Sequence, residues 1–240
     1  MIYITLGSKG GIGKTSISAL VAEYLTSTGK EVFCLDLDAE NASFAKYKEL
    51  EALHINTKNN ETGEIDKRKF DEIIPLILDH KNNDIVIDTG STTYTPFATY
   101  FTENDISGLL KEEGIDTTLI GIVMGGGNTL DSLNALKKMS GDFPETKLMF
   151  FNNQLNGSTT YNDVQMQDTK VLKSLEGRTI GVVNIAQKSG YLFDNISDFA
   201  QKRLLFSDLK ESTDFSMMER RRLTVYRDEV FEQLETVLGA

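Results

Sequence analysis

Short runs of apolar residues alternate with longer segments of helical periodicity along the whole chain. The apolar runs are typical of strands buried on both faces, and they predict strands over residues 1–6, 31–36, 84–88, 117–124, 147–151 and 179–185. The segments between them predict helices near 14–28, 43–53, 70–80, 96–112, 129–140, 164–175, 191–205 and about 214–238. We expect Gly29 to end the first helix, and Pro75 to kink the third or to mark its start.

This alternation predicts an α/β protein with a mostly parallel, twisted sheet and helices on both faces, a three-layer α/β/α arrangement. A chain of 240 residues is long enough for a domain that buries about 70–75% of its unfolded surface. We therefore expect a single domain over 1–240 that ends in a long helix. In such sheets ligands bind beyond the carboxyl ends of the strands, so residues at those ends are the first candidates for chemistry.

Composition and charge narrow the class of protein. The chain has 25 Lys and Arg against 36 Asp and Glu, a net charge of −11, which argues against a protein that coats nucleic acid, although a local basic patch stays possible. Its one cysteine, Cys34, excludes an internal disulfide framework and is consistent with a reducing compartment. No apolar run approaches the ~20 residues that span a bilayer, and the N-terminus lacks a secretory pattern. We expect a cytoplasmic protein.

The stretch "LGSKGGIGKTS", residues 6–16, follows the first predicted strand and opens the first predicted helix. Its glycines let the backbone approach an anion, and the helix N-terminus adds partial positive charge. Lys14 is placed to reach the β- and γ-phosphates, and the Thr15 hydroxyl to bind Mg²⁺. The pattern G-x-x-x-x-G-K-[ST] departs only at Ser8, where a glycine is usual. Rather than a turn with incidental lysines, we predict a phosphate loop for ATP or ADP, built from Gly10, Gly11, Ile12, Gly13, Lys14, Thr15 and Ser16.

Lys9 is a second lysine in the same loop, five residues before Lys14. Two like charges this close repel unless an anion lies between them. The sequence "KGGIGKT" resembles the deviant Walker A loop of the ParA/MinD family of ATPases. That resemblance implies a P-loop NTPase fold, ATP hydrolysis and an ATP-dependent homodimer in which Lys9 reaches the nucleotide of the partner subunit. A solvated lysine on the shoulder of the loop is the alternative.

Two aspartates follow the second predicted strand in "FCLDLDAENAS". They resemble the family's D-x-D element, which implies that Asp36 lies near the Mg²⁺ shell and that Asp38 orients or deprotonates the attacking water. Aspartates at a strand end also cap turns or helices, which is the simpler interpretation. Ala39 and Glu40 stand where the family often has proline and glutamine, so the rate of hydrolysis stays open.

Two further strand ends resemble family motifs. "NDIVIDTGSTTY" carries Asp88 at the Walker B position, and Gly90 stands where the family usually has proline. The resemblance makes Thr15, Asp36 and Asp88 the metal-side residues and lets the Gly90 N–H contact the γ-phosphate. In "FFNNQLNG", Asn153 rather than Asn152 is the candidate that reads the adenine edge, although paired asparagines are also common in turns.

Longer stretches resemble one subgroup of the family. "VIDTGSTTYTPFATYF", "VMGGGNTLDSL" and the tail "SMMERRRLTVYRDEVFEQL" are similar to the TraL-type ATPases of plasmid conjugal transfer regions. This resemblance implies a task in plasmid transfer or maintenance and a protein partner in that system.

The last predicted helix carries both basic and acidic residues. Arg220, Arg221, Arg222 and Arg227 are flanked by acidic side chains, which favours a salt-bridged helix face over a DNA site. The final turns, "FEQLETVLGA", are amphipathic but lack the basic face of a membrane anchor. We expect weak or no binding to DNA and no membrane anchor. The alternatives are a DNA-partitioning ATPase and a nucleotide-binding scaffold with little hydrolysis.

Overall fold

Seven strands form one parallel sheet in the order β3-β2-β4-β1-β5-β6-β7. The computed structural model describes residues 1–188 and 190–239. The strands are β1 (Ile2–Thr5), β2 (Val32–Asp36), β3 (Leu53–His54), β4 (Asp84–Asp88), β5 (Thr117–Met124), β6 (Lys147–Asn153) and β7 (Thr179–Ile185). All strand pairs run parallel, so the predicted fold class is confirmed, and the two-residue β3 is the strand that the sequence pattern missed.

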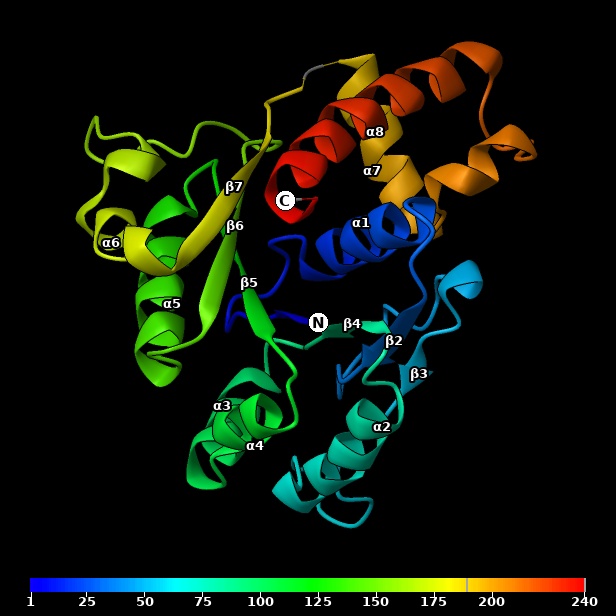
Figure 1. The fold of residues 1–240 in the computed structure, drawn as a ribbon. Coiled ribbons are helices and arrows are strands. Elements are labelled where there is room, and N and C mark those ends of the chain that lie inside the picture. The colour runs from blue at the N-terminus through cyan, green and yellow to red at the C-terminus, as the bar shows by residue number, and fades with distance from the viewer. Residues whose placement is uncertain (189, 240) are drawn as a thin grey trace.

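Successive residues of the buried strands point into two different cores, as strand geometry requires. In β1, Ile2 and Ile4 belong to one hydrophobic cluster and Tyr3 to the other. The first face is covered by α2 (Ile73–Asp79), α3 (Tyr94–Glu103), α4 (Ile106–Glu112), α5 (Thr129–Asp142) and α6 (Lys170–Lys173). The second face is covered by α1 (Lys14–Ser27), α7 (Tyr191–Lys202) and α8 (Met217–Leu238). Figure 1 shows these two groups of helices on opposite sides of the sheet.

Gly29 and Pro75 lie at helix ends, as the sequence pattern predicts, and α8 begins with a side-chain cap. Gly29 follows α1 with φ +83°, and the Lys30 N–H donates to the Leu25 carbonyl, a left-handed C-terminal cap. Pro75 lies in the first turn of α2, where a missing N–H costs no helical bond. Helix α8 begins after Ser216, whose side chain and N–H both bind Glu219.

The prediction of a helix over 43–53 is wrong. That segment contains turns, a 3₁₀ turn at Lys48–Leu50 and the edge strand β3. The N–H groups of Phe44 and Ala45 donate to the buried carboxylate of Asp36, at 2.8 and 2.9 Å. Tyr47 then has an extended backbone, with ψ 95°, so a helix cannot continue through it.

The predicted helix over 70–80 is α-helical only over α2, and three other predicted helices are interrupted or end early. The segment 96–112 is split into α3 and α4 by Asp105, which has φ 45° and whose carboxylate accepts a hydrogen bond from the Gly108 N–H. The segment 164–175 holds a 3₁₀ turn, Met166–Asp168, and the single turn α6, separated by the extended backbone of Thr169. The segment 191–205 is helical only to the end of α7, because Arg203 has a left-handed backbone. Further 3₁₀ helices span Lys67–Glu72, Glu176–Arg178 and Phe206–Lys210.

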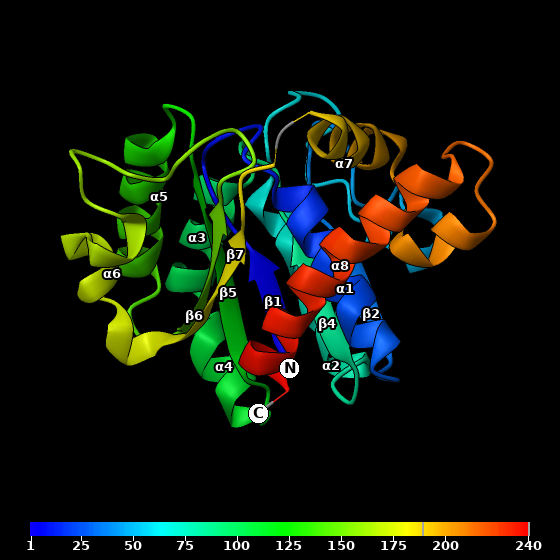
Figure 2. The same cartoon turned by 90° about the horizontal axis from the view of Figure 1, so that it is seen from above.

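The strand order decides which loops meet. Strand β4 lies between β2 and β1, and parallel strands end at the same edge of the sheet. The loops that follow β1, β2 and β4 are therefore neighbours. Figure 2 shows the loop that follows β1 beyond the ends of the strands, in the upper part of the view.

Candidate functional site

A pocket of about 300 Å³ lies at the carboxyl ends of β1, β2 and β4. It is lined by Gly10, Gly11, Gly13, Lys14, Thr15, Ser16, Asp38, Asn41, Ser43, Thr89, Gly90, Ser91 and Arg203. The predicted glycine loop, Asp38 and Gly90 are thus brought together from three strand ends. Five other candidates, Lys9, Ile12, Asp36, Asp88 and Asn153, lie around the pocket without lining it.

The glycine loop adopts a conformation that needs its glycines. Gly11 and Gly13 have φ +73° and +95°, a region that other residues rarely adopt. Gly13 is also the N-cap of α1 and has no side chain with which to cap it. The first N–H groups of α1 therefore lack an intrahelical acceptor, and together with the helix dipole they form a site suited to an anion.

Lys14 brings a positive charge to the same place. Its Nζ donates to the carbonyl of Lys9 at 2.8 Å, and the residue is only 8% exposed. Burial lowers the pKa of Lys14, while the nearby charges of Asp88 and Asp38 raise it. The ammonium group is held at the pocket by a carbonyl and forms no ion pair with Asp38 or Asp88. This arrangement suits a lysine that binds an anion such as a phosphate.

Lys9 points away from Lys14, which removes the expected repulsion. Its Nζ forms an ion pair of 2.7 Å with Asp131, in the first turn of α5. The two side chains are 37% and 58% exposed. The two lysines of the loop thus have separate partners in this structure, one a carbonyl and the other a carboxylate.

Asp88 ends β4 and is completely buried. Its two carboxylate oxygens accept hydrogen bonds from Ser18, at 2.7 Å, and Thr15, at 2.8 Å. Burial raises the pKa of Asp88 to about 7, against the opposing effect of these two hydrogen bonds. A buried carboxylate beside a hydroxyl at the pocket wall is a hard oxygen donor set, and Mg²⁺ takes one or two carboxylates and keeps several waters. The residues present fit Mg²⁺.

Asp36 organises the loop after β2. It is completely buried, and its carboxylate accepts the N–H groups of Asp38, Phe44 and Ala45. Burial raises the pKa of Asp36, and these three hydrogen bonds lower it. Both of its oxygens are already occupied, so the described contacts of Asp36 fix the segment that carries Asp38.

Asp38 lines the pocket and contacts Gly90. Its Oδ1 accepts the N–H groups of Glu40 and Asn41, at 2.9 and 3.3 Å. A Cβ atom on Gly90 would lie 2.5 Å from that same oxygen and 2.8 Å from the Asp38 Cγ. The loops after β2 and β4 are therefore packed so closely that only a glycine fits at position 90 without a shift.

Asn153 lies beneath the glycine loop and contacts its residue Ile12. The Asn153 side-chain nitrogen donates to the Ile12 carbonyl at 3.3 Å, and its oxygen accepts the Leu155 N–H at 3.2 Å. Asn153 is 6% exposed and Ile12 is 2% exposed. In this structure Asn153 braces the loop from below.

Sequence reasoning missed six residues of the site, namely Ser18 and, in the pocket lining, Asn41, Ser43, Thr89, Ser91 and Arg203. Ser18 is one turn along α1 from Thr15 and binds the other oxygen of Asp88; a polar residue on the buried face of an otherwise apolar helix was the available signal. Arg203 reaches the pocket from the end of α7, and no local motif marks it.

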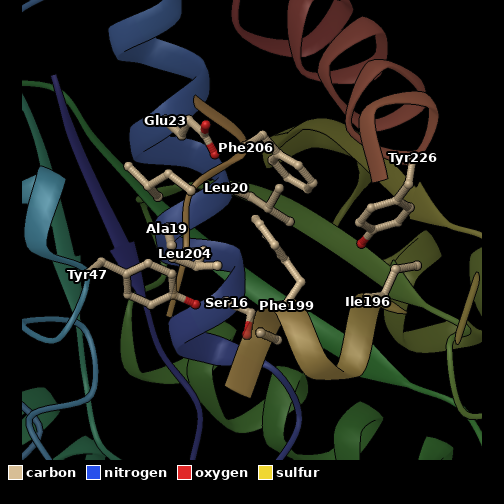
Figure 3. A pocket seen from close by; sticks show the side chains of 12 residues that line it. Ser16, Ala19, Leu20, Glu23, Tyr47, Ile196, Phe199, Leu204, Phe206 and Tyr226 are labelled. Carbon is tan, nitrogen blue, oxygen red and sulfur yellow. The ribbon is translucent and has the colours of Figure 1, made fainter. Parts of the chain in front are cut away.

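A smaller apolar hollow of about 40 Å³ lies beside the pocket, among α1, α7 and α8. Figure 3 shows the aromatic rings of Phe199, Phe206 and Tyr226 around it. Ser16 lines both spaces. The hollow has few polar groups, so phosphate chemistry belongs to the larger pocket.

The arginines of α8 have partners within the chain. Arg220 donates to the Lys210 carbonyl, Arg222 to Asn195, and Arg227 forms an ion pair with Asp228. Arg221 is exposed. Three of these four arginines therefore contact other groups of the chain, and for Arg227 the partner is a carboxylate.

Within residues 1–188 and 190–239, no three His, Cys, Asp or Glu side chains are grouped as a metal-binding cluster. Over the same ranges, none of the helices has the length and apolar character that crossing a membrane requires.

Comparison with known proteins gives a consistent result. Residues 3–221 match the family described as the CobQ/CobB/MinD/ParA nucleotide binding domain. The chain is 30% identical over 236 residues to a Protein TraL of Escherichia coli, covering 98% of this chain and 97% of that protein. A second Protein TraL of Escherichia coli is 27% identical with the same coverage.

Among solved structures, a chain of the MinC:MinD cell division protein complex of Aquifex aeolicus is similar, with a TM-score of 0.52, 12% identity and 96% of each chain covered. At that identity the likeness shows the fold alone. The resemblance to the ParA/MinD family and to TraL proteins, predicted from the sequence, is confirmed.

Proposed function

Because this chain belongs to the CobQ/CobB/MinD/ParA nucleotide-binding family, we propose that it is a Mg²⁺-dependent ATPase that switches between a monomer and an ATP-bound homodimer. We place its task in plasmid conjugal transfer or maintenance, in the cytoplasm and with a protein partner, because its relatives include TraL proteins. One observation carries the proposal. The glycine loop with Lys14, the carboxylate of Asp38 and Gly90 line one pocket although they follow three different strands.

The nucleotide phosphates are assigned to the glycine loop. Lys14 neutralises the β- and γ-phosphates, and the backbone N–H groups from Gly10 to Ser16 surround them. Thr15 and Asp88 hold Mg²⁺, which supplies charge neutralisation at the phosphates when bound. Asp36 stands behind them, contributes its negative charge and fixes the loop after β2. Asn153 is assigned to the adenine edge. To make that contact, its side-chain nitrogen gives up the hydrogen bond to the Ile12 carbonyl.

Asp38 is the residue proposed to act on the attacking water. Among the carboxylates that the resemblance singled out, it alone lines the pocket, while Asp36 and Asp88 are completely buried. Its role is to orient the water or to accept its proton, and the rest of phosphoryl transfer is positioning and charge neutralisation. Gly90 lines the same pocket, and its N–H is assigned to the γ-phosphate.

Lys9 is proposed to serve the nucleotide of the partner subunit. In the structure it is paired with Asp131, and both side chains are substantially exposed. An exposed pair of this kind contributes only about 0–1 kcal/mol, so Lys9 can leave Asp131 for a phosphate at little cost. Dimerisation then depends on ATP in both subunits.

Nucleotide binding is tested by calorimetry with ADP and ATP in the presence of Mg²⁺. The Lys14→Ala variant should lose most of the affinity, because the phosphates lose their main side-chain counter-charge. The Lys9→Ala variant is the matched control and should bind nearly as the parent does. Equal affinity of Lys14→Ala and parent would refute the phosphate-loop assignment.

The dimer is tested by light scattering with ATP, with ADP and without nucleotide. Lys9→Ala should stay monomeric with ATP, and its hydrolysis should fall with dimerisation. Asp38→Ala should bind ATP without cleaving it, so its dimer should persist. A Lys9→Ala protein that dimerises as well as the parent would show that this lysine does not act across the interface.

The two alternative functions predict different results in phosphate-release and DNA-binding assays. A nucleotide-binding scaffold would bind ATP but release no phosphate, with or without Mg²⁺. A DNA-partitioning ATPase would retain random duplex DNA in a gel shift with submicromolar affinity. We expect neither, nor retention on anionic liposomes, because the net charge of −11 opposes anionic surfaces.

A further inference from the structure

We infer that Arg203 is a phosphate-binding residue of the nucleotide pocket, supplied by the end of α7; the inference rests on the proposed nucleotide binding. Arg203 lines the pocket together with Lys14 and Thr15. It belongs to none of the motifs that follow the strands. Its placement, its backbone and its neighbours each point to a role at the pocket.

The backbone of Arg203 is unusual for a residue with a long side chain. It caps α7 in the left-handed region, with φ 56° and ψ 43°, where glycine is the common choice. Its Nη1 donates back to the Ala200 carbonyl at 2.8 Å. The next residues hold the turn in place, because Leu205 and Phe206 are buried. Residues with a strained backbone are common at ligand sites. Arg203 occupies a left-handed position at which a glycine would have no backbone strain.

Arg203 is also oriented by an aromatic ring of the loop after β2. Its guanidinium carbon lies 5.8 Å from the centroid of Tyr47, a cation–π distance. Tyr47 is 3% exposed; burial raises its pKa, and the charge of Arg203 together with hydrogen bonds to Arg203 and Ser16 lowers it. Figure 3 shows the phenol oxygen of Tyr47 pointing toward Ser16, which lines the nucleotide pocket. The guanidinium is thus held next to the first turn of α1.

The charge of Arg203 is available to a ligand. Across the described ranges, 1–188 and 190–239, no carboxylate lies within ion-pair distance of its guanidinium. A guanidinium presents planar paired N–H groups that match two oxygens of a phosphate. The ligand class that suits an arginine beside a helix N-terminus and Lys14 is the phosphate chain of a nucleoside di- or triphosphate.

The test is calorimetric titration of the full chain with ADP and Mg²⁺. Arg203→Ala and Arg203→Gly should each weaken binding by roughly ten- to a hundredfold, the range of a hydrogen bond to a charged group. Arg203→Lys should recover part of the affinity, since it keeps the charge and loses the paired geometry. Arg221→Ala, which removes an exposed arginine of α8, is the matched control and should bind as the parent does.

Two further measurements separate a ligand contact from a structural role. Arg203→Gly should keep the melting temperature of the parent, because glycine relieves the left-handed backbone. The ADP affinities of Arg203→Ala and Arg203→Gly should also fall less steeply with added salt than that of the parent, since one ionic contact is gone.

An Arg203→Gly protein with parental stability and parental ADP affinity would overturn the inference. If Lys14→Ala loses ADP while the Arg203 variants retain it, only this inference fails and the proposed function stands. If the parent itself binds no nucleotide, the proposed function fails, and this inference fails with it.

Discussion

Replacing Gly90 by alanine perturbs the contact between two loops of the pocket and leaves the phosphate loop untouched. The new Cβ would lie 2.5 Å from the Asp38 Oδ1, 2.8 Å from its Cγ and 3.2 Å from its Cα. Ordinary contacts begin at 3.4 Å, so the carboxylate must move by about 0.9 Å or the loop after β4 must shift. The backbone of Gly90 is not in the left-handed region, so the effect comes from the side chain alone.

The expected size of the effect follows from that displacement. Overpacking of this kind costs about 1–3 kcal/mol of stability, and a 1 Å misplacement of a reacting group can cost about a hundredfold in rate. We therefore expect kcat for ATP hydrolysis to fall between ten- and a hundredfold. The Kd for ADP should stay within about twofold of the parent, because Lys14 and Thr15 keep their positions.

The assay is steady-state phosphate release with calorimetry on the same protein. Gly141→Ala is the matched control: position 141 lies within α5 and a Cβ there would have no neighbour within 4 Å. Alanine in this last turn of α5 should stabilise the helix by at most about 0.5–1 kcal/mol relative to glycine and leave hydrolysis unchanged. A Gly90→Ala enzyme that hydrolyses ATP at the parental rate would refute the placement of Asp38 at the attacking water.

Three other predictions concern stability. The carboxylate of Glu23 accepts the Ser207 N–H at 2.8 Å, and burial raises the pKa of Glu23. The folded protein therefore binds this proton more tightly than the unfolded chain does. As a result, the stability of the parent falls as pH rises above 4.5, the usual pKa of a glutamate. The melting temperature of Glu23→Gln relative to the parent should thus increase from pH 4 to pH 7, and a difference independent of pH would contradict this. Asp36→Asn leaves fewer acceptors for three backbone N–H groups and should lower the free energy of unfolding in urea by about 1–3 kcal/mol, whereas an unchanged midpoint would show that the loop after β2 does not depend on that carboxylate. Gly181→Ala would bring a Cβ to 2.5 Å from Val237 of α8 and should destabilise by about 1–3 kcal/mol; a parental urea midpoint would mean that α8 moves freely on β7.

The strands and the glycine loop could be predicted because each depends on neighbours in the sequence. A run of apolar residues forms a strand of the sheet whichever strands become its neighbours. The strands β4, β5 and β7 accordingly have the predicted bounds. The start of α1 at Lys14 follows from the glycines before it. The parallel fold class also predicts that Lys14, Asp38 and Gly90 lie at one edge of the sheet, and the strand order β2-β4-β1 brings them into one pocket.

What could not be predicted depends on contacts between distant residues. The segment 43–53 has apolar residues at helical spacing, but the N–H groups of Phe44 and Ala45 donate to Asp36. These hydrogen bonds stabilise a tight turn instead of a helix. The pairing of Lys9 with Asp131 joins positions 122 residues apart. Arg203 reaches the pocket only because α7 ends where it does. No window of sequence contains either of these last two contacts.

The contacts around Asp88 connect metal binding with the position of Asp38. Thr15 donates to Asp88 in this structure, and the same two groups are the proposed ligands of Mg²⁺. Coordination of the metal by Thr15 and Asp88 would replace this hydrogen bond. Gly90 is two residues farther along that backbone and lies against Asp38, with no room for a methyl group between them. A movement of Asp88 would therefore press the loop after β4 against Asp38, and we expect hydrolysis to be sensitive to the residue at position 90, where this chain has a glycine and the family usually has a proline.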